Sequence, residues 1–379
     1  MRDVSRRRFL VSTGAASIAG LAGCSGGDGG SDGGSGDGGS GDGGSDGGSG
    51  DGGSDGGSGD TTASDGGEGT TTGGGGELTS VRILHPEGVL QYPMYEAGLD
   101  QGFWEEEGID LTVDYAPFPA QVQSLSNGEV EVSGLSMIPY MSNFLKGEDV
   151  VTFGFSGCLQ AVNGLYTRAS SDYQSPSELE GRTIGVWSFG SSTVQSFQAI
   201  LAEQTGLQLR EDFQTTTAAP PALLGLLTDE EIDGVVNISG LTVEMESKPD
   251  TFRRLMSINN AWNEMSGNYL PITSWFASAD WYEQNTEAAA ALLRGSEAAT
   301  QYWRENTVSI LEEYGEPAGI TNQAKTDVVD EFANQGQVFQ GESLADEYVS
   351  SVWDFVELMN EYEFIESVPS QDEILRNPL

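Results

Sequence analysis

The stretch GRTIGVWSFGSSTVQ (residues 181–195) decides how the rest of the chain is interpreted. Its apolar start predicts a short strand over residues 183–187, and the glycine-containing turn leads into Ser-Ser-Thr, which opens an amphipathic helix. A helix that begins beside the carboxyl end of a strand presents free N–H groups that can hold a small polar or anionic group. Because Ser and Thr also cap helices that bind nothing, an ordinary helix cap is the alternative.

The first 24 residues have the features of an export signal. Paired arginines stand before Phe9 and Leu10, a pattern typical of twin-arginine signals, and an uncharged run over residues 11–22 is too short for a comfortable membrane span. The run ends in LAGC (residues 21–24), which resembles a lipoprotein processing box and makes Cys24 the expected lipidation site. These features predict a protein anchored to the extracytoplasmic face of the cell membrane.

Residues 25–76 consist almost wholly of Gly, Ser, Asp and Thr in near-repeats. Such a segment has little apolar surface to bury, so we expect a disordered tether. It contributes only about ten acids to a formal net charge of −43, so most of the acidity belongs to the rest of the chain. An acidic surface with few lysines is typical of a halophilic protein, because concentrated salt screens self-repulsion, and it excludes nucleic acid as an expected partner.

Cysteine and histidine are too scarce for the catalysis that depends on them. If Cys24 is lipidated, Cys158 has no partner, and we expect it to be a small buried hydrophobe. With His85 as the single histidine, Cys/His catalysis and His-rich metal sites are disfavoured. Nucleophile-elbow and phosphate-loop motifs are not evident, so no cofactor, metal or enzymatic activity is expected.

Alternating strand and helix patterns after residue 78 predict an α/β fold with mainly parallel sheets. Expected strands cover residues 81–84, 111–115, 130–135, 150–155, 164–167, 183–187, 213–216 and 234–236. Expected helices cover residues 92–102, 120–126, 139–145, 194–204, 219–227, 286–303, 323–334 and 344–362. The chain after residue 276 is therefore expected to be nearly all helical.

Four segments in this order resemble the substrate-binding proteins of ABC importers in the nitrate, sulfonate, taurine and pyrimidine-precursor group. They are QGFWEEEGID (residues 101–110), LSNGEVEV (125–132), SPSELEGRTIGV (175–186) and LTDEEIDGVV (227–236). The resemblance implies a two-lobed type II periplasmic-binding-protein fold with two crossover strands, in which the lobes close around a ligand. We place lobe 1 at residues 78–166 plus 271–379, with the helical C-terminal part packed on it, and lobe 2 at 167–270.

The resemblance also implies partners: a small-molecule ligand, an ABC permease and its ATPase, with the binding protein itself a monomer. A ligand-presenting sensor subunit is an alternative. Relatives often carry a Trp-Asp-Pro type segment where this chain has VVNISGL (residues 235–241), and basic residues are few near the predicted loops. The identity of the ligand is therefore not implied by the family.

Ligands in open α/β sheets lie outside the carboxyl ends of strands, and this rule selects the candidate ligand-binding residues. They are His85, Gln91, Ser133, Ser136, Trp187, Ser188, Ser191, Ser192, Thr193, Asn237 and Ser239. Each has a structural alternative: Trp187 as a core aromatic, Ser136 as a helix cap and His85 as an exposed loop histidine.

Two classes of ligand fit these residues. The Ser191–Thr193 helix start suits a sulfonate, nitrate or carboxylate, because N–H donors need no buried cation. Aromatic residues near the predicted loops, Trp187 among them, suit a flat heterocycle such as a pyrimidine. The sequence favours the small organic anion slightly.

Overall fold

The computed structural model describes residues 78–379 apart from positions 87, 117, 156–161 and 340–342. The export signal, Cys24, the expected tether and Cys158 lie outside the described residues. The strands are β1 (Thr79–Pro86), β2 (Ile109–Ala116), β3 (Val132–Ser136), β4 (Val150–Phe155), β5 (Gly164–Arg168), β6 (Thr183–Val186), β7 (Gln214–Thr217), β8 (Gly234–Val236), β9 (Phe252–Ser257) and β10 (Thr273–Ser278).

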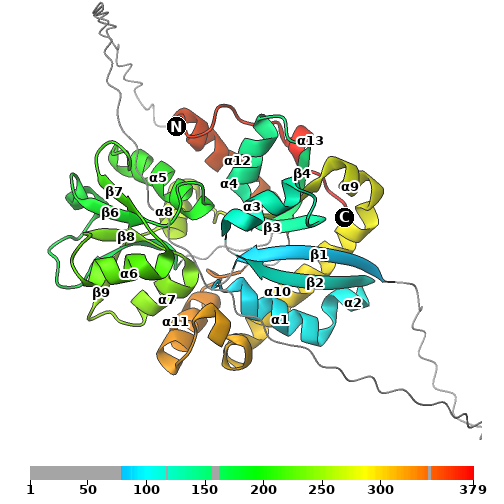
Figure 1. The fold of residues 1–379 in the computed structure, drawn as a ribbon, viewed down its shortest axis with the longest axis horizontal. Coiled ribbons are helices and arrows are strands. Elements are labelled where there is room, and N and C mark those ends of the chain that lie inside the picture. The colour runs from blue at the N-terminus through cyan, green and yellow to red at the C-terminus, as the bar shows by residue number, and fades with distance from the viewer. Residues whose placement is uncertain (1–77, 87, 117, 156–161, 340–342) are drawn as a thin grey trace, which may run out of the picture. The chain divides into compact units, whose positions relative to one another are not determined.

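Two five-stranded sheets organise the described residues (Figure 1). The first has the order β2-β1-β3-β10-β4 and the second β7-β6-β8-β5-β9. We call the elements built on them the first and second lobes. The chain passes to the second sheet after β4 and returns to the first at β10, so two connections join the lobes.

Each sheet is mixed but mainly parallel, as expected, because four of its five strands point in the same direction. Strand β1 pairs in parallel with β2 and β3, and β6 pairs in parallel with β7 and β8. Strand β10 runs antiparallel to β3 and β4, and β5 runs antiparallel to β8 and β9. The antiparallel strands β5 and β10 are the first strands after each passage between the sheets, and local sequence patterns do not reveal this reversal of direction.

Helices cover both faces of each sheet. They are α1 (Gln91–Gln101), α2 (Phe103–Glu106), α3 (Phe118–Ser126), α4 (Met137–Leu145), α5 (Ser192–Thr205), α6 (Pro220–Thr228), α7 (Ser239–Glu246), α8 (Ile258–Ser266), α9 (Ala279–Gln284), α10 (Thr286–Tyr314), α11 (Gln323–Asn334), α12 (Asp346–Glu361) and α13 (Gln371–Ile374), with 3₁₀ helices η1 (Pro176–Leu179) and η2 (Glu316–Ala318). Helices α5 and α8 lie on one side of the second sheet, and α6 and α7 lie on the other (Figure 1).

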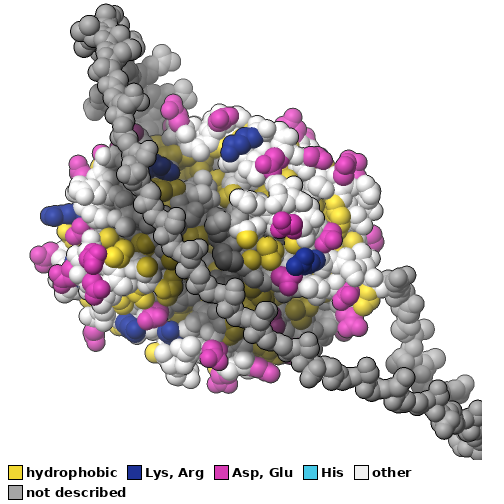
Figure 2. Space-filling view, viewed as in Figure 1, with side chains coloured by type: hydrophobic (Ala, Val, Ile, Leu, Met, Phe, Trp, Pro, Cys, Tyr) yellow, Lys and Arg dark blue, Asp and Glu magenta, His cyan; other side chains and the backbone are white. Residues whose placement is uncertain are grey.

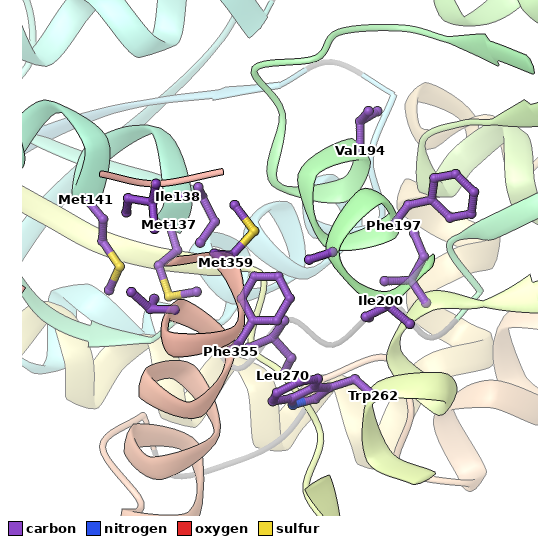
Figure 3. Packing of buried hydrophobic residues seen from close by; sticks show 14 of the residues in the cluster. Met137, Ile138, Met141, Val194, Phe197, Ile200, Trp262, Leu270, Phe355 and Met359 are labelled. Atoms are coloured by element: carbon purple, nitrogen blue, oxygen red, sulfur yellow. The ribbon is translucent and has the colours of Figure 1, made fainter. Parts of the chain in front are cut away.

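The helical C-terminal part packs largely on the first lobe, as expected. Helix α10 lies against α1 and α2, and its Leu292 joins Trp104, Val81 and Ile83 in one buried apolar cluster. A second cluster is formed by α4, α5, α8 and α12, and it therefore contains side chains from both lobes (Figure 3). No helix among the described residues has the length and apolarity needed to cross a membrane.

Candidate functional site

A cavity of about 770 Å³ lies between the two lobes. The first lobe contributes the ends of β1 and β3, the start of β10, and a wall made of η2 and α11. The second lobe contributes the turn after β6 and the first turns of α5, α6 and α7. The volume suits a small molecule, and much of the wall is apolar, with Pro220, Ile238, Leu241 and Ile272 among its residues.

Most of the predicted ligand-binding residues lie on this cavity. They are His85, Gln91 and Ser136 from the first lobe and Trp187, Ser188, Thr193 and Ser239 from the second. The strand-end rule works here because β1, β3, β6 and β8 direct their carboxyl ends toward the space between the lobes. Trp187 also packs against two apolar clusters, so it is both a core aromatic and a wall residue.

Four predicted residues lie away from the cavity surface and stabilise the elements around it. Ser191 is the N-cap of α5: its hydroxyl accepts from the backbone N–H of Val194 at 3.2 Å. The Ser192 hydroxyl accepts from the backbone N–H of Ile138 at 3.3 Å, which links α5 to α4 of the other lobe. In this structure the Ser-Ser-Thr run therefore serves as a helix cap, as an interlobe contact and, at Thr193, as cavity wall.

Ser133 and Asn237 also form contacts that stabilise the fold. The Ser133 hydroxyl accepts from the Tyr140 hydroxyl at 2.9 Å inside the first lobe. The Asn237 amide donates to the carbonyl oxygen of Pro220 at 3.0 Å, and its Oδ1 accepts from the backbone N–H of Ile238 at 2.9 Å. Asn237 thus joins the starts of α6 and α7, which both form cavity wall.

His85 has the most unusual environment of the predicted residues. It lies near the end of β1, its side chain is buried, and its ring is 4.7 Å from that of Tyr95. Neither ring nitrogen has a hydrogen-bond partner among the described residues. Burial lowers the pKa of the imidazole to about 3, so the ring is neutral at physiological pH and offers one donor and one acceptor.

Gly134 makes room for this histidine. A Cβ at this position would lie 3.3 Å from Nε2 of His85 and 2.8 Å from the Trp275 ring. Any side chain at position 134 would therefore displace one of the two rings. The backbone of β3 thus helps to set the position of the imidazole at the cavity wall.

The charged groups on the cavity are few, and the cation among them is already paired. Lys325 donates from Nζ to the carbonyl oxygen of Gly319 at 2.8 Å and lies 3.5 Å from a carboxylate oxygen of Glu244. A hydrogen bond from Lys248, together with the nearby charge of Lys325, lowers the pKa of Glu244 despite partial burial, so this carboxylate is ionised. Glu316 adds a second acid to the lining.

The described residues contain no group of three or more His, Cys, Asp or Glu side chains placed to hold a metal ion. Among the residues described, the charged side chains on the cavity wall are those of Lys325, Glu244 and Glu316. Two carboxylates against one ammonium make this wall slightly acidic.

Sequence reasoning missed one wall of the cavity. Its residues are Gly240, Leu241 and Glu244 on α7, Glu316 to Gly319 at η2, and Lys325 on α11. The start of α7 follows β8 and was within reach of the strand-end rule, but η2 and α11 follow helix α10. A helical stretch remote from any strand end carries no local pattern that marks it as cavity wall.

The sequence model of the family described as NMT1/THI5 like matches residues 92–308. The chain belongs to this family. The matched segment contains most of both lobes but ends before η2 and α11, and it begins just after His85 and Gln91. The cavity residues before the matched segment, such as His85 and Gln91, and those after it, at η2 and α11, therefore lie outside the family model.

Solved structures share the fold of this NMT1/THI5-like protein at low sequence identity. A protein from Bordetella bronchiseptica RB50 aligns with a TM-score of 0.64 and 18% identity, over 79% of this chain and 95% of that one. The periplasmic aliphatic sulphonate-binding protein SsuA from Escherichia coli aligns with a TM-score of 0.61 and 15% identity, over 79% and 92%. The periplasmic nitrate-binding protein NrtA from Synechocystis PCC 6803 aligns with a TM-score of 0.59 and 13% identity, over 79% and 86%.

These similarities confirm the periplasmic-binding-protein fold expected from the sequence. A comparison with curated proteins found no match to the sequence. At these identities the solved structures establish the fold of this family member but not its ligand.

Proposed function

We propose that this chain is the solute-binding component of an ABC importer and captures a small molecule in the cavity between its lobes. The observation that carries the proposal is the cavity itself, because strand ends and helix starts of both lobes converge on a space of about 770 Å³. Delivery of the ligand to a permease and its ATPase is part of the proposal. Fold similarity to sulphonate- and nitrate-binding proteins supports it.

The charges on the wall favour a flat uncharged heterocycle over an organic anion. An anion would meet Lys325 only in competition with Glu244, and Glu316 would repel it. A heterocycle could pack against Trp187 beside the neutral imidazole of His85. We therefore propose a ligand of the pyrimidine type, which the sequence alone ranked second.

One feature of the cavity favours an organic anion. Thr193 lies on both the first turn of α5 and the cavity, where N–H groups and the helix dipole attract negative charge. A sulfonate, taurine or nitrate seated there would not require an unpaired cation. The anion is thus the competing ligand class, and the two classes can be separated by experiment.

Thermal unfolding of the purified protein in high salt tests both ligand classes. One panel contains pyrimidines, and the other contains sulfonates, taurine and nitrate. A ligand at 100 times its Kd should stabilise the folded state by about 2.7 kcal/mol and raise the melting temperature by several degrees. A rise only with pyrimidines supports the heterocycle, and a rise only with anions overturns it. No rise with either panel, together with turnover of a substrate, would overturn the binding-protein proposal.

We also propose that the protein is exported by a twin-arginine signal, anchored through a lipid on Cys24 and monomeric. The LAGC motif at residues 21–24 supports the anchor. A Cys24→Ala variant should then appear in the soluble fraction of cells that retain the wild-type protein in the membrane fraction. A variant that still fractionates with membranes contradicts the lipid anchor.

A further inference from the structure

The cavity extends across the carboxyl edge of the second sheet, so its two ends meet different helices. Helix α5 starts on one side of this sheet, and α6 and α7 start on the other (Figure 1). Trp187 follows β6 and lines the cavity between them, and it packs against one apolar cluster that contains α5 and another that contains α6. The cavity therefore has an α5 end and an α6–α7 end, with Trp187 between them.

Hydroxyl groups gather at the α5 end. Thr193 lies in the first turn of α5, Ser136 and Thr273 are paired residues of β3 and β10, and all three line the cavity. The backbone N–H of Ile138, in α4 directly after β3, donates to the Ser192 hydroxyl and so joins these elements across the lobes. The Ser136 hydroxyl makes no capping hydrogen bond to α4. We call this the hydroxyl end, and it suits the hydrogen-bonding edge of a polar ring.

Apolar side chains from both lobes line the α6–α7 end, which we call the apolar end. They are Pro220, Pro221, Ile238, Leu241, Pro317 and Ala318. Pro221 and Pro317 are exposed, and Leu241 is partly exposed. The starts of α7 and η2 lie close together, since a Cβ on Gly240 would be 2.6 Å from the carbonyl oxygen of Ala318. Apolar groups that water reaches on a cavity wall are favourable partners for an apolar part of a ligand.

Polar residues beside the apolar end already have partners. Lys325 lies 3.5 Å from a carboxylate oxygen of Glu244, and the Oδ1 atom of Asn163 accepts from the Thr242 hydroxyl at 3.4 Å. Glu316 of η2 is exposed to solvent. A polar group of the ligand placed here would compete with these interactions, whereas an apolar group would leave them intact.

The size of the cavity also favours a ligand larger than a bare ring. Its volume of about 770 Å³ lies in the upper part of the range of roughly 300–1,000 Å³ that is typical of sites for drug-sized ligands. An unsubstituted pyrimidine would fill only a small part of this volume. A ligand that also covers the apolar end would gain affinity in proportion to the apolar area that it removes from water.

We propose that the ligand has two parts: a polar ring that contacts Trp187 and the hydroxyl end, and an apolar substituent that fills the apolar end. The inference rests on the proposed function for the site and for the ring, and it adds the chemical class of the substituent. Leu241 of α7 and Pro317 of η2 are then residues that determine specificity, because they contact the substituent from opposite lobes.

Uracils that carry alkyl chains of increasing length test the substituent. Two series, with the chain at carbon 5 or at carbon 6, present it in different directions, and isothermal titration calorimetry in high salt gives the Kd of each member. Each methylene buried at the apolar end should raise affinity about fourfold, so a butyl chain should bind about sixtyfold more tightly than a methyl group in at least one series.

Two failures of this titration have different meanings. Affinity that does not rise with chain length in either series overturns the two-part ligand but leaves pyrimidine binding intact. No binding by any member, uracil included, overturns the pyrimidine ligand and the two-part ligand together.

Variants of the wall test where the substituent lies. Leu241→Ser removes apolar surface from the apolar end, so the preference for butyl over methyl should shrink at least about fivefold. Pro317→Ser, at an exposed position of the first lobe, should also reduce it and carries the test if Leu241→Ser does not fold. Met265→Ser is the matched control, because Met265 on α8 is 37% exposed and is not among the described residues that line the cavity. A preference that both wall variants leave unchanged, or that Met265→Ser reduces equally, overturns the placement at the apolar end.

Discussion

The burial of His85 should make the stability of the protein depend on pH. Burial lowers the pKa of its imidazole from 6.5 to about 3, so between these values the unfolded chain binds more protons than the folded one. The free energy of unfolding should therefore fall as the pH falls below 6.5, by about 2 kcal/mol at pH 5 from this group alone. A His85→Leu variant should lack this contribution.

Urea unfolding of the wild type and of His85→Leu at pH 7.5 and pH 5 measures the contribution of His85 to the free energy of unfolding. The carboxylates titrate in both, so the difference between the two pH responses isolates the histidine. Parallel responses would show that the imidazole is accessible to protons in the folded state. The sequence identified His85 at a strand end, yet its ring packs against Tyr95 of the next helix and beside Gly134 of β3, a tertiary arrangement that local patterns do not reveal.

At the scale of elements, α12 connects the lobes through the shared apolar cluster. Phe355 is fully buried and packs edge-on against Trp262 of α8, with ring centroids 5.3 Å apart. Phe355→Ala should lower the free energy of unfolding by about 3–5 kcal/mol. Val308→Ala on α10 is the control, because that side chain is 38% exposed and its loss should cost less than about 0.5 kcal/mol.

Denaturant titration followed by calorimetry would check both variants. Because the cluster contains side chains of both lobes, the lobes should unfold in one transition, shifted as a whole in Phe355→Ala. Two transitions, of which only one moves, would contradict a core shared in this way.

Elements with strong local patterns were predictable. The strand at Thr183–Val186 and the helix from Ser192 follow from a short apolar run and a capping residue. Strand β9 was not predicted, because Phe252–Ser257 carries two arginines and is recognised as a strand only through its pairing with β5. The η2 and α11 wall was missed for a similar reason: tertiary packing against α7 brings it to the cavity.

At the scale of the whole molecule, the chain has 59 acidic residues against 16 Lys and Arg. Asp and Glu side chains are scattered over the face of the described residues seen in Figure 2, with few basic ones between them. Their mutual repulsion destabilises the compact state and is screened over about 10 Å at 0.1 M salt but about 3 Å at 1 M. The melting temperature should therefore rise steeply with KCl up to about 1 M.

Scanning calorimetry in KCl from 0.05 to 3 M distinguishes screening from general salt effects. Screening predicts that most of the gain occurs below about 1 M, because repulsion between surface acids is already short-ranged there. A gain that continues in proportion to salt up to 3 M would instead indicate strengthened apolar burial. A melting temperature that does not change below 1 M would contradict the halophilic interpretation, since the acidic surface would then cost the folded state nothing.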